Sequence, residues 1–174
     1  METFEQQGHD SVAVANRFIA TAHKQGAPIF SLAQLIRMIY IAHGFHLAFQ
    51  DTNLIKDEVQ AWPQGPVIPR VYETFLRIPP VSHPLPAKPD VQDEMDLDPY
   101  ALGLIELIYQ GYGHMNYAQI AELMRQRGTP WDLVYKSKGN RATIEPELTR
   151  EYYHALIENR RKKAQALQHL EAAL

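Results

Sequence analysis

The fold is decided by the stretch Leu32-Ala-Gln-Leu-Ile-Arg-Met-Ile-Tyr40-Ile-Ala-His-Gly44-Phe-His46-Leu-Ala48, which predicts one long helix. Its apolar residues recur at i, i+3, i+4 and i+7, the spacing that places them on a single wide face. Ser31 precedes the stretch and Gln34 follows three residues later, which is the arrangement of a capping box. Because so many of its positions are apolar, we expect this helix to lie at the centre of a mainly α-helical protein.

Helix signals also flank the central helix on both sides. On its N-terminal side, Asp10 or Ser11 can cap a helix that runs to about Lys24. On its C-terminal side, a short helix can follow Pro66, whose missing N–H costs nothing in a first turn. Four more helix starts carry a capping residue or an early proline: Asp98-Pro99, Asn116, Thr129-Pro130 and Pro146. The last of these opens a long C-terminal helix, so the chain predicts a bundle of about six to seven helices.

The helical spacing is interrupted twice. Two short apolar stretches, Leu54-Ile55 and Val59-Gln-Ala-Trp62, are separated by Lys56-Asp-Glu58 and predict a small β-hairpin near residues 54–62. Residues 78–98 are rich in proline and acidic side chains, which predicts a flexible loop. Neither half of the chain is large enough for an independent core, so we expect one domain over residues 1–174.

Composition narrows the class of protein. The chain has no cysteine, which excludes disulfides and thiolate metal sites and fits a cytoplasmic location. A formal net charge of -3 disfavours nucleic-acid binding, which needs a basic surface. The apolar run from Phe30 to Phe49 contains Arg37, His43 and His46 and is too polar to span a membrane. The first residues lack the basic and apolar regions of a signal peptide.

Two further patterns carry chemistry, each with a simpler alternative. His43-x-x-His46 could place two imidazoles on one helix face for a metal-dependent hydrolase, but no third ligand follows, and two hydrogen-bonded core histidines are the favoured interpretation. The basic residues Arg160-Arg-Lys-Lys163 could contact phosphates in a DNA-binding regulator, but a solvated helix face is favoured in an acidic chain. No catalytic constellation and no cofactor motif is present.

The segment from Trp62 to Tyr72 is the most specialised part of the sequence. Tryptophan, tyrosine and proline offer contact area at low entropic cost, and aromatic residues are enriched at interface hot spots. Gly65 lies between two prolines, where it allows the backbone to turn. A binding surface and a rigid corner of the core account for this composition equally well.

The residues from Leu32 to Phe75 resemble the Panacea domain, also called SocA-like, of bacteria and their phages. Its pattern is L-x-K-L-x-K-L-x-Y-x-A-x-G-x-H-L-A followed by E-A-W-x-x-G-P-V-x-P-x-V-Y-x-x-F. The second block here is Gln60-Ala-Trp62-Pro-Gln-Gly65-Pro66-Val67-Ile-Pro69-Arg-Val-Tyr72-Glu-Thr-Phe75. Thr129-Pro-Trp131 and Tyr152-Tyr153 are similar to later elements of the family. Gln60 departs from the family glutamate and Arg37 from the helix lysine.

The resemblance implies an antitoxin that binds a cognate protein toxin encoded by a neighbouring gene. In one branch of the family, the antitoxin acts as an adaptor that hands its toxin to a bacterial protease. No catalytic residues, metal or cofactor come with the match. The residues expected to bind the partner are Trp62, Gln64, Gly65, Pro66, Val67 and Tyr72, with Arg37, Tyr40 and His43 as neighbours from the central helix. The stripe Ala164, Leu167, Leu170 and Leu174 permits either a dimer helix or a packed terminal helix, so the oligomeric state stays open.

Overall fold

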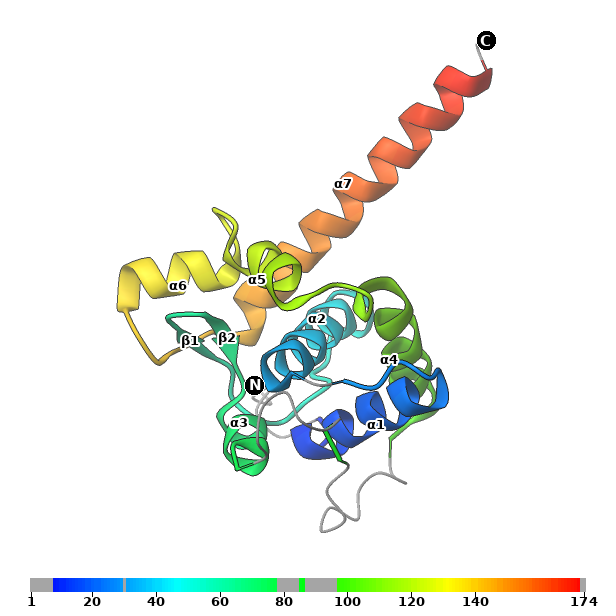
Figure 1. The fold of residues 1–174 in the computed structure, drawn as a ribbon. Helices are drawn as coiled ribbons and strands as arrows, with labels where there is room; N and C mark the ends of the chain where they lie inside the picture. Colours follow the sequence, from blue (N-terminus) through cyan, green and yellow to red (C-terminus); the bar gives the residue numbers. More distant parts are fainter. Residues whose placement is uncertain (1–7, 30, 78–84, 87–96, 173–174) are drawn as a thin grey trace.

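The computed structural model describes residues 8–29, 31–77, 85–86 and 97–172, and it confirms a mainly α-helical protein with a small β-sheet (Figure 1). The predicted flexible loop falls mostly on residues 78–84 and 87–96, which lie outside the described part of the chain. The helices are α1 Ser11–Lys24, α2 Leu32–Gln50, α3 Pro69–Phe75, α4 Pro99–Tyr112, α5 Tyr117–Arg125, α6 Pro130–Lys138 and α7 Pro146–Ala172. The strands are β1 Gln60–Trp62, β2 Gly65–Val67 and β3 Ala142–Thr143.

Helix α2 lies at the centre of the fold, as predicted. It contacts α1, α3, α4, α5 and α7, and nearly all its residues from Leu35 to Ala48 are buried. The Ser31 hydroxyl accepts a hydrogen bond from the Gln34 N–H, which caps the helix. The Gln34 side chain does not close the predicted capping box, because it donates instead to the carbonyls of Gly113 and Met115. The prediction that this run is too polar to span a membrane is wrong on composition, because by length and composition α2 could cross one. However, 78% of that window is buried inside the fold, as in a core helix.

Helix α7 packs on α2 through its first half only. Gly44 makes the approach possible, because a Cβ built on it would lie 2.2 Å from the Tyr153 ring. Beyond Ile157 the described side chains of α7 are exposed, and Figure 1 shows this half extending away from the body. The packed alternative for the C-terminal stripe is therefore wrong for Ala164 and Leu167, both of which are exposed.

The small sheet has the order β2-β1-β3, with antiparallel pairing on both sides of β1. Its hairpin joins β1 to β2 through Pro63-Gln64. The predicted strand Val59-Gln-Ala-Trp62 contains β1, but its predicted hairpin partner, Leu54-Ile55, is wrong. Leu54-Ile55 pairs elsewhere, because the His9 N–H donates to the Leu54 carbonyl and Ile55 forms an isolated bridge with His9. Pro66 lies in β2 opposite Ala61, and the helix that follows starts at Pro69 instead.

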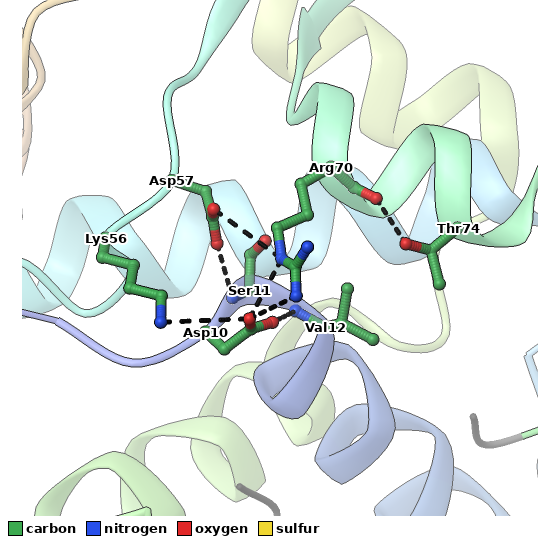
Figure 2. A network of polar contacts seen from close by, with 7 residues as sticks. All are labelled: Asp10, Ser11, Val12, Lys56, Asp57, Arg70 and Thr74. Carbon is green, nitrogen blue, oxygen red and sulfur yellow. Dashed lines mark hydrogen bonds and ion pairs between the residues drawn. The ribbon is translucent and has the colours of Figure 1, made fainter. Parts of the chain in front are cut away.

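A polar network joins the start of α1 to α3 and to the segment before β1 (Figure 2). Asp10 caps α1 through the Val12 N–H and accepts hydrogen bonds of 3.0 and 2.5 Å from the Arg70 guanidinium. Asp57 accepts a bond from the Ser11 N–H and lies 3.8 Å from Arg70. Burial would raise the pKa of Asp10, but Arg70, the Val12 N–H and Lys56 outweigh it and lower the pKa. The network anchors α3, and with it the end of the hairpin.

Candidate functional site

The indole ring of Trp62, at the end of β1, is half-buried and contacts one side chain of its own strand and two from other parts of the chain. Its centroid lies 5.0 Å from that of Tyr72 in an edge-on arrangement, and the Arg141 Cζ lies 4.7 Å from it. The indole Nε1 donates a 3.0 Å hydrogen bond to the Gln60 side chain. These contacts hold a large aromatic side chain in one orientation while part of it stays accessible to solvent.

Trp131 joins the same cluster from α6. Its indole Nε1 donates a 2.7 Å hydrogen bond to the Trp62 carbonyl, and its ring stacks on Tyr135 with centroids 5.0 Å apart. Thr129 caps α6 and Pro130 occupies its first turn, so Trp131 stands at a fixed helix start. Helix α6 contacts β1 and lies beside the hairpin in Figure 1. We call this cluster the tryptophan patch; its members are Gln60, Trp62, Tyr72, Trp131, Tyr135 and Arg141.

Arg141 is held in the patch by an uncommon backbone conformation. Its φ is 64°, in the left-handed region that side chains other than glycine rarely occupy. Its N–H donates a 2.7 Å hydrogen bond to the Ala61 carbonyl, next to the β1–β3 pairing. Arg141 was not predicted as a site residue, because its contact with Trp62 depends on pairing between distant strands.

Three of the predicted site residues meet beneath the hairpin turn. The Arg37 guanidinium donates a 2.6 Å hydrogen bond from Nη2 to the Gln64 carbonyl, and its Cζ lies 4.7 Å from the Tyr117 ring centroid. Gly65 has a φ of +127°, which favours glycine, and a Cβ built on it would lie 3.7 Å from the Arg37 Nε. Pro66 is buried and Val67 half-buried. The turn therefore rests on a charged side chain from α2.

Tyr40 and His43 point to other parts of the fold. Tyr40 is buried against α7, where its hydroxyl lies 3.3 Å from the Thr149 Oγ1, and burial raises its pKa. His43 lines a cavity of about 360 Å³ formed with residues 53, 55–59 and 143–146. Burial, with a smaller effect from His46, lowers the pKa of His43 from 6.5 to about 3, so its imidazole is neutral at physiological pH.

The two histidines of α2 do not share a site. His46 lines a different cavity with His9 and Asp98, and its Nδ1 lies 2.8 Å from the Thr52 carbonyl oxygen. Burial is also the largest cause that lowers the pKa of His46. Within residues 8–29, 31–77, 85–86 and 97–172, no group of three or more His, Cys, Asp or Glu side chains could hold a metal ion. The described part of the chain gives the metal-dependent alternative no ligand set.

The four basic residues of α7, Arg160-Arg-Lys-Lys163, differ from one another in their contacts. Arg160 lies against the body, where its Nη2 donates to the Tyr112 hydroxyl at 3.2 Å and its Cζ lies 5.8 Å from the Phe45 ring centroid. Arg161 pairs with Glu158 at 3.4 Å. Lys162 and Lys163 are exposed on the projecting half of the helix. The tract is therefore not one uniform basic face for phosphate contact.

A helical body with half-exposed tryptophan and tyrosine rings gathered at one hairpin is typical of a protein-binding domain. The sequence model of the antitoxin SocA-like Panacea domain matches residues 35–132, which is more than half of the chain. The chain therefore belongs to the SocA-like Panacea family, as its motifs predicted. Antitoxin SocA of Caulobacter vibrioides (strain NA1000 / CB15N) is 29% identical over 146 residues, covering 79% of this chain and 76% of that antitoxin. No solved structure matches the chain.

Proposed function

We propose that this protein is a cytoplasmic antitoxin that neutralises a cognate protein toxin by direct contact through the tryptophan patch. The observation that carries the proposal is the convergence of Trp62, Tyr72 and Trp131, all half-buried, from β1, α3 and α6. All three lie within the residues matched by the family model. Rigid aromatic side chains with part of their surface exposed supply much of the binding energy at protein interfaces.

The partner is a toxin encoded by a neighbouring gene, as the family membership suggests. A toxin held by its antitoxin can also be delivered to a protease, as the family resemblance implies for one branch. These two modes share the contact at the tryptophan patch but differ in the host factor they need. Neutralisation that persists in a host lacking its cytoplasmic proteases supports direct binding alone, whereas neutralisation lost there supports the adaptor mode.

Co-expression with the toxic product of the adjacent gene tests the proposal. We expect wild-type protein to restore growth and Trp62→Ala not to restore it. Truncating an interface tryptophan lowers the affinity for the partner by about 30-fold or more. Leu107→Ala is the matched control, since Leu107 is a large apolar side chain on α4 that is 65% exposed. Both variants are first checked for a cooperative thermal transition by circular dichroism. Growth that is equally restored by folded Trp62→Ala would exclude the patch, and no rescue by wild type would exclude the function.

A further inference from the structure

Arg37 is a buried charge without a charged partner. Its side chain is 3% exposed, and none of the ion pairs among the described residues includes it. A guanidinium carries five N–H donors. Nη2 uses one for the Gln64 carbonyl, while Nε and Nη1 are buried with no acceptor in the described part of the chain.

Support of the hairpin turn does not account for this charge. A buried cation loses its hydration and is normally paired with a carboxylate or fully hydrogen-bonded. A cation–π contact with the Tyr117 ring offsets part of the lost hydration free energy. The one hydrogen bond that Arg37 makes goes to a carbonyl of exposed Gln64, which water could satisfy equally well. The unused donors are therefore better explained by an acceptor that arrives from outside.

Two neighbours of the Arg37 guanidinium bear on its accessibility. One is Gly65, which has no side chain that could cover the guanidinium. A Cβ added to it would still lie 3.7 Å away from Nε and Nη2. The other is the ring of Tyr117, the first residue of α5, which is 49% exposed. Rotation of this ring toward solvent would remove one of the groups that lie against the guanidinium, beside the turn that leads from Trp62 to Gly65. The buried charge thus lies at the edge of the tryptophan patch.

We propose that Arg37 receives a carboxylate of the bound toxin, from an aspartate, a glutamate or the chain terminus, when the Tyr117 ring moves aside. This inference rests on the proposed function and specifies the chemistry of the partner. The tryptophan patch supplies apolar contact, and Arg37 supplies one charge-assisted anchor next to it. A planar guanidinium matches a carboxylate in geometry, which a lysine at this position would do less well.

A carboxylate probe tests the site without the toxin. Sodium acetate is titrated into protein labelled with ¹⁵N-arginine, and the Nε–H signal is assigned to Arg37 by its absence in Arg37→Met. We expect a saturable shift in wild type that occurs at lower acetate in Tyr117→Ala, and none with sodium chloride at equal ionic strength. No saturable shift of any arginine Nε–H signal in wild type or Tyr117→Ala overturns the inference, and this outcome needs no assignment, so it stands even if Arg37→Met fails to fold.

The second arm compares stability with neutralisation. Arg37→Met keeps a long side chain without the charge, so we expect it to melt at the wild-type temperature or above while its affinity for the adjacent-gene toxin falls about 30-fold or more. Arg37→Lys keeps the charge and recovers part of the affinity. Wild-type affinity in folded Arg37→Met overturns the inference and leaves the proposed function standing. If the wild-type protein itself does not bind that toxin, the proposed function fails, and the acetate titration alone decides the role of Arg37.

Discussion

Mild acid should destabilise this protein through His43. The imidazole is 3% exposed in the centre of α2, and its Nδ1 has no hydrogen-bond partner in the described part of the chain. Burial and the neighbouring His46 lower its pKa from 6.5 to about 3. Below pH 6.5 the unfolded chain therefore binds a proton that the folded protein does not bind. The free energy of unfolding is unaffected by this group above pH 6.5 and falls as the pH drops from 6.5 toward 3.

The size of the effect follows from the width of that interval. At pH 5, about 1.5 units below the unfolded pKa, the loss is about 2 kcal/mol at ~1.36 kcal/mol per unit. This is a large share of the total stability of ~5–15 kcal/mol that is typical of a domain. Asp10 and Asp98 have lowered pKa values, so their contributions are lost only at lower pH, below about 4. His46, whose pKa is also lowered, adds a loss of the same sign.

Urea unfolding at pH 7.5 and pH 5, for wild type and His43→Gln, measures the effect. The glutamine does not titrate, so the variant retains the contribution of His46 but not that of His43. We expect wild type to lose about 2 kcal/mol more than the variant between the two pH values. An equal loss in both proteins would refute the reasoning, because it would show that His43 binds its proton equally well in the folded and unfolded chains.

Two further predictions concern packing and capping, and both are read from urea unfolding curves. Gly44→Ala should cost about 2–3 kcal/mol, because its Cβ would lie 2.2 Å from the Tyr153 ring between α2 and α7. Gly103→Ala on α4 is the matched control, because nothing lies within 4 Å of the new Cβ, and it should be neutral or slightly stabilising. Similar losses of unfolding free energy in the two variants would contradict the close approach of α7 to Gly44. Asp10→Ala should cost about 2 kcal/mol or more by removing the α1 cap and the Arg70 pair, and Asp10→Asn less, since asparagine still caps. Equal costs for the two Asp10 variants would assign the whole effect to the charge.

The starts of several helices were predictable because their signals are local. Asp10 caps α1, and Asn116 with Gln119 forms the capping box of α5. Thr129 followed by Pro130 opens α6. Each signal needs only a side chain and backbone N–H groups within three residues, so the chain carries it whatever the rest of the fold does. The family pattern from Leu32 to Phe75 is equally a property of the chain, and the family match confirms it.

Contacts between distant residues could not be predicted in the same way. The predicted hairpin partner of β1 was wrong, because the backbone of Leu54-Ile55 pairs with His9, more than forty positions before it. Gln34 has the spacing of a capping box, yet a carbonyl from the end of α4 competes successfully for its side chain. In each case a partner supplied by packing, and not the local pattern, decides which contact forms.

The sequence by itself determined the central helix, the caps and the aromatic block that marks the family. Only the tertiary structure decided what surrounds that block. It brings Arg141 to Trp62 through pairing between β1 and β3, and Trp131 through packing of α6 on β1. It also buries the Arg37 charge beneath Gly65. The physical reason is that helix formation depends on neighbours along the chain, whereas a binding surface depends on which distant side chains the packed elements bring within reach of one another.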